Sequence, residues 1–551
     1  MAIKEQKILH YPRLDSVFMI EKTIEKHEGK LKKKQLWEKL PKKMMYQTYS
    51  FILDYLISLN KVIIKDKRIK LVEGDKIYKL EKRSTNMRTH NLGELDEKLA
   101  GEKVKLVGWV DVIREHGKLI FVDLRDRYGK AQCVIHEKNS EFNKIKKITR
   151  ESCILIEGEV KIRPKGSENK EISSGNVEIG IEKVEIFTLC PVLPFEIGEV
   201  ENEDLRLKYR FLDLRSKKMQ NNIIMRSKIL KFVRDYFDKQ GFIDIETPIL
   251  AKSTPEGARD YIVPSRNFPG KFYALPQSPQ LFKQMAMVAG FDKYIQIARC
   301  FRDEDLRSDR QPEFTQIDLE MSFIEQDDII NVLEGMLKYI FKESLNVDVK
   351  TPFPRITYDE AMKKYKTDRP DMRKNKADDK EFAFCWVVDF PLFEYSKEDK
   401  RHKSTHHPFT MPDVDFSEEK KKLSFNENSN SVAYDVILNG SEIGGGSLRI
   451  HDTEIQEKVF ELLKISKKEA QEKFGFLLDA LNFGACPHGG IALGFDRLVQ
   501  IMLEEESIRE CIAFPKNKEA KDVMLDAPGE LSARQLKDVH ISVIEKKKGK
   551  K

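Results

Sequence analysis

The stretch Phe301–Phe323, FRDEDLRSDRQPEFTQIDLEMSF, joins two largely apolar segments through a loop that is very rich in charge. The segment before it is Tyr294–Ala298. The residues after the loop come close to the apolar–polar alternation of a half-buried strand through Phe314, Ile317, Leu319 and Met321. We expect an antiparallel hairpin with a charged tip. Arg302 stands just before this tip, where its planar guanidinium could hold two oxygens of a phosphate. A solvated hairpin with paired surface charges is the alternative.

A second stretch, Gly489–Arg497 (GGIALGFDR), predicts a glycine-rich strand that runs into a helix over Leu498–Leu503. Glycines allow a ligand to approach the backbone closely. Arg497, at the start of the helix, would face the same ligand as Arg302. The two stretches together predict one phosphate-binding site.

These two stretches resemble motifs 2 and 3 of the class II aminoacyl-tRNA synthetases: Phe-Arg-x-Glu in a hairpin, and Gly-x-Asp-Arg at a strand–helix junction. Ile243–Leu250 (IDIETPIL) resembles motif 1, with Pro248 as its marker proline, and follows a helix expected over residues 219–240. All three motifs stand in the order of the family. The resemblance implies a homodimer that forms through the motif 1 helix and strand.

The bulk composition indicates a globular protein of two to four domains in its 551 residues, with 40% hydrophobic and 34% charged residues. No apolar run of 18 residues exists, so we expect no membrane span. The first residues lack an apolar signal core, which favours a cytoplasmic protein. None of the seven cysteines lies in a CxxC motif, so we expect reduced thiols and no zinc ribbon.

Positive charge is concentrated at the N-terminus. Residues 1–86 carry 21 Lys+Arg and 11 Asp+Glu, a balance of +10, whereas the whole chain carries +7. Such a basic region indicates contact with a polyanion; lysine-rich helices that keep a small domain soluble are the alternative. Helical spacings followed by a hairpin over 62–72 predict a winged-helix-like extension at 1–75, and residues 76–90 are expected to be a linker.

Residues 91–187 change to a pattern of five short strands, which suits an OB-fold barrel that binds nucleic acid. Alternation places Phe121 on the face opposite Ile120 and Val122, so it is a candidate platform for a stacked base. A core aromatic is the alternative. Residues 188–204 read as a proline-containing hinge. Residues 205–544 predict one large α+β domain around an antiparallel sheet, and 545–551 a basic tail.

The resemblance is closer than the class level, since residues 87–544 are similar to bacterial-type aspartyl-tRNA synthetases throughout. Family-specific phrases carry it, among them GWVDVIREHGKLIFVDLRDRYGKAQCV, PEGARDYIVPSR, ALPQSPQLFKQ, THHPFTMP and NGSEIGGGSLRIH. Two departures stand out. The domain that such members usually carry between motifs 2 and 3 has no room between Tyr358 and Trp386, and the first 86 residues are an addition.

The resemblance implies a ligase that activates L-aspartate with ATP and transfers it to tRNA(Asp). Arg302 would hold the α-phosphate and Arg497 the γ-phosphate, and both are expected to be catalytic. Asp435 and Glu442 would bind Mg²⁺ that bridges the phosphates. The ATP-binding residues implied by the resemblance are Arg302, Asp303, Glu304, Gln311, Glu442, Gly494, Phe495, Asp496 and Arg497.

The resemblance also implies an aspartate pocket in which Lys283 and Arg449 take the side-chain carboxylate. Two cations there would disfavour asparagine, whose amide would place donors against donors. The remaining residues expected to contact aspartate are Glu256, Ser278, Gln280, Arg302 and His406.

The anticodon is expected to meet the barrel, where Phe121 would stack a base and Arg114 and Gln132 would read base edges. His116 lies in a turn where the family's members with histidine often also charge tRNA(Asn), which leaves the choice between one and two tRNAs open. Enzymes for lysine or asparagine are rivals, but lysine would need acidic partners in place of the two cations. A non-catalytic RNA-binding paralogue would be expected to lose Arg302, Arg497, Asp435 or Glu442, and all four are present.

Overall fold

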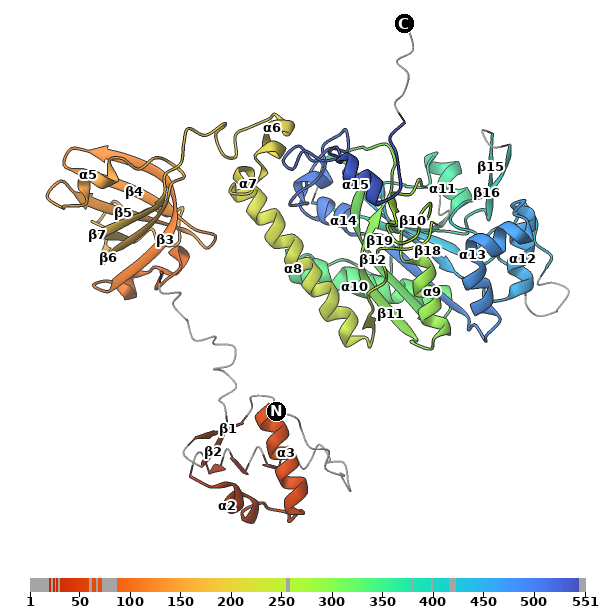
Figure 1. The fold of residues 1–551 in the computed structure, drawn as a ribbon, viewed down its shortest axis with the longest axis horizontal. Coiled ribbons are helices and arrows are strands. Elements are labelled where there is room, and N and C mark those ends of the chain that lie inside the picture. Colours follow the sequence, from red (N-terminus) through yellow and green to blue (C-terminus); the bar gives the residue numbers. More distant parts are fainter. Residues whose placement is uncertain are drawn as a thin grey trace, which may run out of the picture. The chain divides into compact units, whose positions relative to one another are not determined.

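The computed structural model describes residues 19–20, 23–24, 26–27, 30–58, 62–65, 68–71, 87–253, 258–378, 380–397, 400–415 and 423–544. The chain divides into two units, Met1–Pro194 and Phe195–Lys551, and Figure 1 shows the elements of each.

The N-terminal part of the first unit contains α2 (Lys33–Glu38), α3 (Tyr46–Ser58) and the antiparallel hairpin of β1 (Val62–Lys65) and β2 (Arg68–Leu71). These elements enclose a core of their own. Its buried members come from both helices, the hairpin and the preceding segment at Ile20, and include Ile20, Leu36, Tyr49, Ile52, Leu53, Leu56, Val62 and Ile69. The predicted hairpin is confirmed. The first predicted helix lies partly outside the described residues, so the winged-helix arrangement stays a prediction.

The second part of this unit is a closed five-stranded barrel, as the sequence predicted, and its strand order is β3-β4-β5-β7-β6. Alternation fills its interior: Ile120, Val122 and Leu124 are buried, whereas Phe121 on the other face is partly exposed. The strands are β3 (Lys103–His116), β4 (Leu119–Arg125), β5 (Lys130–His136), β6 (Cys153–Ile162) and β7 (Val177–Thr188). A short helix, α5 (Phe142–Ile145), precedes β6.

The second unit is built around an eight-stranded sheet in the order β13-β14-β17-β18-β19-β12-β11-β8. The predicted antiparallel sheet is correct for the six inner strands only, because β13 and β8 pair in parallel at the two edges. The strands are β8 (Ile243–Asp244), β11 (Lys293–Phe301), β12 (Glu313–Ser322), β13 (Arg355–Thr357), β14 (Phe384–Val388), β17 (Ala433–Leu438), β18 (Ser441–Leu448) and β19 (His488–Gly494).

The motif 1 strand is shorter than the sequence suggested. The preceding helix, α8 (Lys217–Lys239), closely matches the expected bounds, but only β8 (Ile243–Asp244) pairs with the sheet. Pro248 has no backbone N–H to donate to a neighbouring strand, so the extended segment up to Leu250 cannot continue the ladder there.

Apolar side chains of the inner strands pack against α8, α10 (Gln326–Leu345) and α14 (Phe495–Met502), which share one core. From β12 this core receives Ile317, Leu319 and Met321. The intervening residues of β12 point to the opposite face, where Lys283 of α9 (Gln280–Val288) meets them. This strand is therefore apolar on one face and polar on the other, although both faces are buried.

The remaining elements surround the sheet. Two helices, α10 and α11 (Tyr358–Tyr365), follow β12, as the sequence predicted.

Among the described residues, no helix combines the length and the apolar character that crossing a membrane requires. The other elements are α6 (Glu203–Lys208), α7 (Arg210–Asp213), β9 (Ile262–Pro264), β10 (Phe272–Ala274), β15 (Phe393–Ser396), β16 (Arg401–Ser404), α12 (Thr453–Leu462), α13 (Lys467–Leu481), η3 (Ile508–Glu510) and α15 (Ala533–Asp538).

Candidate active site

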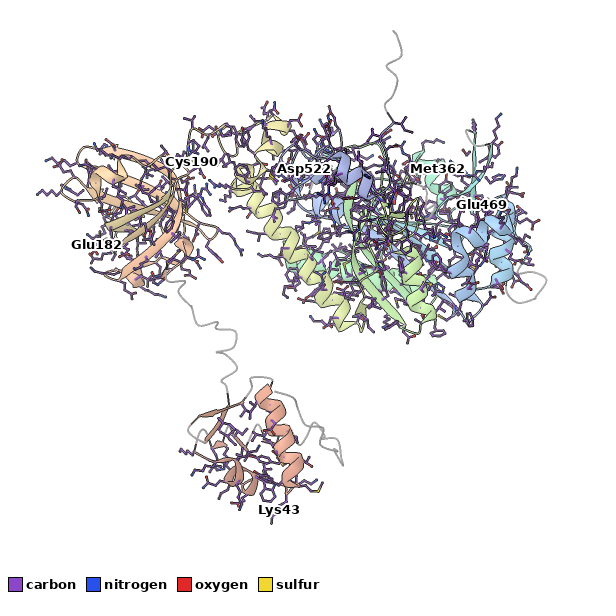
Figure 2. All side chains as sticks on the ribbon, viewed as in Figure 1. Lys43, Glu182, Cys190, Met362, Glu469 and Asp522 are labelled. Carbon is purple, nitrogen blue, oxygen red and sulfur yellow. The ribbon has the colours of Figure 1, made fainter. Side chains whose placement is uncertain are left out.

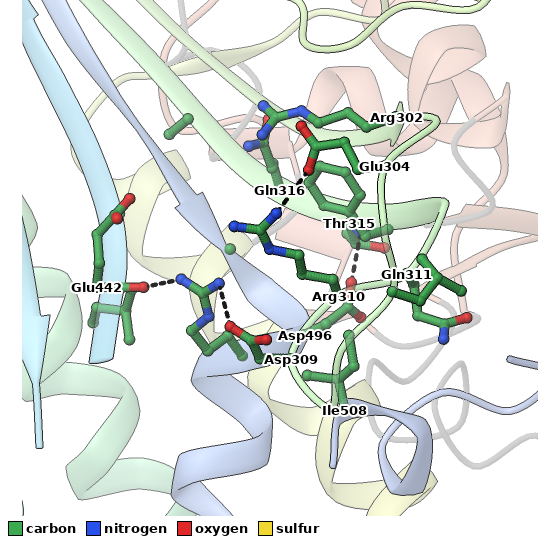
Figure 3. Close-up of a pocket in the computed structure, with 17 residues that line it drawn as sticks. Arg302, Glu304, Asp309, Arg310, Gln311, Thr315, Gln316, Glu442, Asp496 and Ile508 are labelled. Atoms are coloured by element: carbon green, nitrogen blue, oxygen red, sulfur yellow. Dashed lines mark hydrogen bonds and ion pairs between the residues drawn. The ribbon is translucent and has the colours of Figure 1, made fainter. Parts of the chain in front are cut away.

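The charged hairpin and the glycine-rich strand meet as the sequence predicted. Strand β11 pairs with β12 in an antiparallel hairpin, and β12 pairs with β19, so that Gln316 lies opposite Gly494. Between the hairpin loop, β18 and the start of α14 lies a cavity of about 280 Å³. Its lining includes Arg302, Glu304, Arg310, Gln311, Gln316, Glu442, Gly444, Gly494, Asp496 and Arg497 (Figure 3).

The two predicted phosphate-binding arginines lie on this one cavity. The guanidinium of Arg302 stacks over the ring of Phe314 at 5.1 Å, and its Nε donates to the carbonyl of Gln277 at 3.4 Å. Arg497 donates to the carbonyl oxygen of Glu442 and pairs with Asp309 Oδ2 at 3.0 Å. The Nε of Arg497 is buried without a hydrogen-bond acceptor among the described residues. The pair is therefore placed to receive anionic oxygens.

The hairpin loop contributes a third cation that sequence reasoning did not assign. Arg310 reaches into the cavity beside Arg302 and pairs with Glu304 at 3.2 Å (Figure 3). The sequence showed Arg310 only as one of many charged loop residues, and nothing in its spacing separated it from solvated neighbours.

Two other predicted nucleotide-binding residues already use their side chains in hydrogen bonds within the protein. Gln311 lines the cavity, but both ends of its amide are bonded to the backbone of Lys516, at 2.8 and 3.1 Å. Asp496 accepts from the backbone N–H of Thr315 at 2.7 Å and pairs with Arg226 at 2.6 Å, and so ties α14 to β12 and α8.

Two of the predicted residues do not present their side chains to the cavity. Phe495 has no exposed surface, because it packs into the apolar core with Arg226 stacked on its ring at 4.6 Å. Its side chain therefore faces the core and not the cavity, and a contact of its backbone with ATP stays a prediction. Asp303 is not among the residues that line the cavity; its carboxylate faces Arg259 at 3.7 Å on the surface.

Asp435 and Glu442 face each other across the β17–β18 hairpin. A Cβ atom on Gly445 would lie 2.5 Å from Asp435 Oδ1 and 3.9 Å from Glu442 Oε1, so both carboxylates approach one glycine. The closeness of Asp435, together with burial, raises the pKa of Glu442. His406 Nε2 lies 3.0 Å from Asp435 Oδ1. His406, predicted as an aspartate contact, thus bonds to a carboxylate of this pair in the structure, and its contact with aspartate stays a prediction.

This pair fits a divalent cation held jointly with a substrate. Two neighbouring carboxylates that repel each other are stabilised by a cation between them, and Mg²⁺ is commonly bound by one or two carboxylates plus phosphate oxygens. Among the described residues no group of three or more His, Cys, Asp or Glu side chains could hold a metal ion. The protein would thus supply part of the ligand set, and the substrate phosphates the rest.

Lys283 and Arg449 also lie together, on the polar face of β12, and are 0% and 2% exposed. Lys283 Nζ lies 3.2 Å from Asp318 Oδ1 and 3.4 Å from Glu320 Oε2. Arg449 donates to both oxygens of Glu320, at 2.8 and 3.2 Å. The predicted cation pair is therefore real, but it sits within a four-charge cluster in which two acids balance two bases.

The electrostatics of this cluster follow from burial and from its cations. Burial raises the pKa of Asp318 despite the nearby Lys283, and its Oδ2 has no hydrogen-bond donor among the described residues. Burial acts to raise the pKa of Glu320 as well, but Arg449 and Lys283 more than offset it, and the pKa is lowered. Glu320 is thus held ionised between the two bases.

His407 is a site residue that the sequence analysis missed. Burial, and then the charge of Arg449, lowers its pKa well below the usual value, so its neutral ring accepts from Arg449 Nη1 through Nε2. The signal was present in the adjacent histidines of HHPF, of which only the first was chosen.

The remaining residues predicted to contact aspartate lie in different places. Gln280 opens α9, and its side-chain Nε2 is buried without an acceptor among the described residues. Ser278 lines a separate cavity of about 230 Å³ with Leu281, Phe282 and Phe476. Glu256 lies outside the described residues.

The predicted anticodon residues share one outer face of the barrel. Arg114 stands opposite Phe121 in the β3–β4 register, pairs with Asp123 at 2.9 Å and donates to Gln132 at 3.3 Å. His116 is exposed at the end of β3. This face combines an aromatic ring with a cation and an amide, the groups that stack bases and bond to their edges.

Known proteins match both parts of this architecture. The family model for class II tRNA synthetases (D, K and N) matches residues 202–518, and the model for the OB-fold nucleic acid binding domain matches residues 104–187. An aspartate–tRNA(Asp/Asn) ligase of Thermotoga maritima is 43% identical over 83% of this chain and 100% of its own length. One of Aquifex aeolicus is 41% identical over 83% of this chain and 98% of its own.

Solved structures agree on the fold. Asparaginyl-tRNA synthetase from Pyrococcus horikoshii, complexed with asparaginyl-adenylate, is 25% identical with a TM-score of 0.64 and covers 77% of this chain and 97% of its own. Aspartyl-tRNA synthetase from Entamoeba histolytica, at 23% identity and a TM-score of 0.61, covers 80% of this chain and 93% of its own. Since a family model covers more than half of the chain, the chain belongs to the class II tRNA synthetases of the D, K and N group.

Proposed function

We propose that this protein is an aspartate–tRNA ligase of protein biosynthesis. In the first step a carboxylate oxygen of aspartate attacks the α-phosphorus of ATP, the bond to the β-phosphate breaks, and pyrophosphate leaves. In the second step a hydroxyl of the terminal adenosine of tRNA attacks the carbonyl carbon of aspartyl-adenylate, and AMP leaves. The observation that carries the proposal is the buried pair Lys283–Arg449 beside a cavity lined by Arg302 and Arg497.

Arg302 and Arg497 would act mainly by position and charge. Phosphoryl transfer requires alignment of the reacting atoms and neutralisation of the charge on the phosphate oxygens. Arg302, held by Phe314 and the Gln277 carbonyl, is fixed before substrate arrives. Arg497 is fixed by Asp309 and retains an unused buried donor for the triphosphate.

Asp435 and Glu442 would hold Mg²⁺ together with the phosphates of ATP, since the pair fits such an ion. When bound there, Mg²⁺ supplies positive charge next to the phosphate oxygens. His406, bonded to Asp435, would orient that carboxylate. Glu304 and Gly494 line the same cavity and would contact the nucleotide.

Selection of aspartate would rest on donors that are already fixed. Arg449 Nη1 bonds to His407 and Ser447, and Lys283 Nζ bonds to Asp318 and two backbone carbonyls, so the side-chain carboxylate would take these donors in exchange for their neutral acceptors. Asparagine would present its own donors to these groups, and lysine would bring a third cation. Ser278, Gln280 and Glu256 would complete the pocket around the α-amino group.

We further propose that both tRNA(Asp) and tRNA(Asn) are charged. The relatives in Thermotoga maritima and Aquifex aeolicus are named aspartate–tRNA(Asp/Asn) ligases, and His116 is exposed at the end of β3. Phe121 would stack an anticodon base, while Arg114 and Gln132 would read base edges. Aminoacylation of each purified tRNA tests this, and success with tRNA(Asp) alone would limit the enzyme to one substrate.

The finer architecture also belongs to this proposal. We assign 1–75 to a winged-helix-like extension, 76–90 to a linker, 91–187 to the anticodon-binding barrel, 188–204 to a hinge, 205–544 to the catalytic domain and 545–551 to a basic tail. The extension lies outside both family models, which begin at residues 104 and 202. We assign the cytoplasm as location.

An inserted domain would be absent between motifs 2 and 3, as the sequence suggested. Helix α11 ends at Tyr365 and β14 begins at Phe384. The alignment with the Thermotoga maritima relative runs over 583 positions but uses 83% of this chain, which supports a segment in the relative that this chain lacks.

A homodimer would form through α8 and β8. Ile243, Ile249 and Leu250 are exposed apolar residues at this edge of the sheet, where a second copy would cover them. Sedimentation or light scattering on the full chain tests the assembly, and a monomer at micromolar concentration would contradict it.

ATP–pyrophosphate exchange with each of the twenty amino acids tests the central proposal. Exchange that depends on aspartate alone is the expected result. Exchange with asparagine or lysine at a comparable kcat/KM, or no exchange with any amino acid, would refute it.

A further inference from the structure

The N-terminal part of the chain carries a dense basic segment that the family models do not cover. Residues 30–43, called the basic segment here, contain seven lysines and one acid, Glu38. Leu36 and Leu40 of the segment are buried in the local core. Six of the lysines are exposed: Lys30, Lys32, Lys34, Lys39, Lys42 and Lys43. Lys43 is labelled in Figure 2.

Among the described residues, these charges are largely uncompensated. In the part of the chain that the structure describes, the one ion pair of the segment joins Lys33 to Asp54 of α3, at 3.2 Å. The six exposed lysines form no ion pair with any described acid. Unpaired like charges repel one another and reduce stability, so a surface that concentrates them suits an anionic partner.

The basic segment is held in place. Trp37 Nε1 donates to the carbonyl of Met44 at 2.9 Å, and the Trp37 ring meets Tyr46 edge-on at 5.3 Å. The hydroxyl of Tyr49 donates to the carbonyl of Lys33 at 2.8 Å. Tyr46 is 42% exposed next to these contacts. The lysines are therefore presented on an ordered surface with an aromatic ring at its edge.

The distribution of charge favours contact with phosphates over reading of base pairs. A helix that reads the major groove carries the side chains that reach base edges. Helix α3 contains no lysine or arginine and exposes Asp54. The cations stand instead on α2 and in the segments that flank it on both sides, and all are lysines, which act as point charges rather than as bidentate forks.

We propose that the basic segment binds the phosphate backbone of the tRNA that this chain aminoacylates, which makes it a second RNA-binding surface beside the barrel. The inference rests on the proposed function for the choice of RNA. A second surface on the same chain raises the local concentration of tRNA once either surface is engaged. It acts on tRNA affinity and leaves the activation of aspartate unchanged, because that step needs no tRNA.

The test uses the full chain with Lys39→Ala, Lys42→Ala and Lys43→Ala combined. If all three contact phosphates, counterion release predicts a KM for tRNA raised roughly ten- to fiftyfold at about 0.15 M salt. The slope of log affinity against log salt should become shallower by about 2. Aspartate-dependent ATP–pyrophosphate exchange should keep its wild-type rate.

Two controls separate this surface from a general effect of charge. Lys338→Ala, Lys342→Ala and Lys350→Ala together remove the same charge from exposed positions of the catalytic unit, and should leave the KM for tRNA near wild type. Glu38→Gln removes the single acid of the basic segment and should tighten tRNA binding and steepen the salt slope.

Three results would overturn the proposal. The first is an unchanged KM and salt slope in the Lys39/Lys42/Lys43 variant. The second is an equal loss in the catalytic-unit control, which would make the effect one of net charge. The third is a loss of binding to duplex DNA but not to tRNA, which would assign the surface to DNA. Absence of aspartate-dependent exchange in the wild type would refute the proposed function instead, while filter binding of tRNA still tests the surface.

Discussion

Replacing Arg449 by methionine tests the aspartate pocket most directly. Arg449 is almost fully buried and makes four hydrogen bonds besides the one to His407. It donates to Glu320 at 2.8 and 3.2 Å, to the carbonyl of Gly490 at 3.2 Å and to Ser447 Oγ at 2.7 Å. Methionine has a similar length and fills the space, so the change removes mainly the charge and the donors.

The magnitude follows from what remains behind. Removing one partner of a buried ion pair costs about 3–5 kcal/mol of stability. Because Lys283 still faces Glu320 at 3.4 Å, we expect the lower end of that range. For catalysis, the charge-assisted hydrogen bond that Arg449 would donate to the substrate carboxylate, worth about 1.5–3 kcal/mol, predicts a fall of roughly ten- to a hundredfold in kcat/KM for aspartate.

The assay is ATP–pyrophosphate exchange at varied aspartate and at varied ATP, below the thermal transition of both proteins. The KM for ATP should change little, and the preference for aspartate over asparagine should collapse, because methionine cannot distinguish a carboxylate from an amide. Arg449→Lys, which keeps the charge but not the fork, should lie between wild type and Arg449→Met.

The reasoning fails if Arg449→Met lowers the melting temperature but retains kcat/KM for aspartate within about tenfold. It also fails if selectivity against asparagine survives. Either result would make Arg449 a structural partner of Glu320 only.

Four other outcomes follow from the geometry. Asp435→Asn should raise the Mg²⁺ concentration needed for half-maximal exchange, and an unchanged Mg²⁺ titration would remove Asp435 from the ion site. Gly445→Ala should impair exchange without unfolding the protein, because its Cβ would lie 2.5 Å from the Asp435 carboxylate; wild-type kinetics would show that the carboxylate can move aside. Burial acts to raise the pKa of Glu510, but its bidentate pair with Arg206 lowers it. The stability from this pair is therefore present above the unfolded pKa of about 4.3 and lost as the pH falls through the folded value, so Glu510→Gln should flatten the unfolding free energy against pH in that acidic range, as urea titrations can measure. Phe121→Ala should raise the KM for tRNA by an amount that corresponds to roughly 1–3 kcal/mol of binding free energy, the contribution of one stacked base. ATP–pyrophosphate exchange should keep its wild-type rate. An equal loss of activity in both assays would indicate a misfolded barrel.

The strands around the site could be predicted because their patterns are local. Alternation at Ile317, Leu319 and Met321 marked β12, and glycines followed by Asp-Arg marked the junction of β19 with α14. The parallel edges of the sheet could not be predicted, because β8 and β13 are two and three residues long and carry no periodicity of their own.

Site residues could be predicted where the residue type itself indicates one chemistry. They could not be predicted where packing decides whether a side chain faces the cavity or the core. Arg302 and Arg497 reach the same cavity, as their motifs implied. Phe495 stands between two cavity-lining residues in the sequence, and only the direction of the first turn of α14 places it in the core. The acids that balance Lys283 and Arg449 lie in the charged half of an alternation, where sequence alone suggests solvent and the structure shows burial.

The two faces of β12 have a consequence for how selectivity can diverge. Odd-numbered positions from Ile317 to Met321 support the packing of α8 and α10, whereas Gln316, Asp318 and Glu320 face the reactants' side of the sheet. Substitutions at even-numbered positions could therefore adapt the pocket to another amino acid while the scaffold stays intact. A deletion of a single residue would exchange the two sets and destroy both at once.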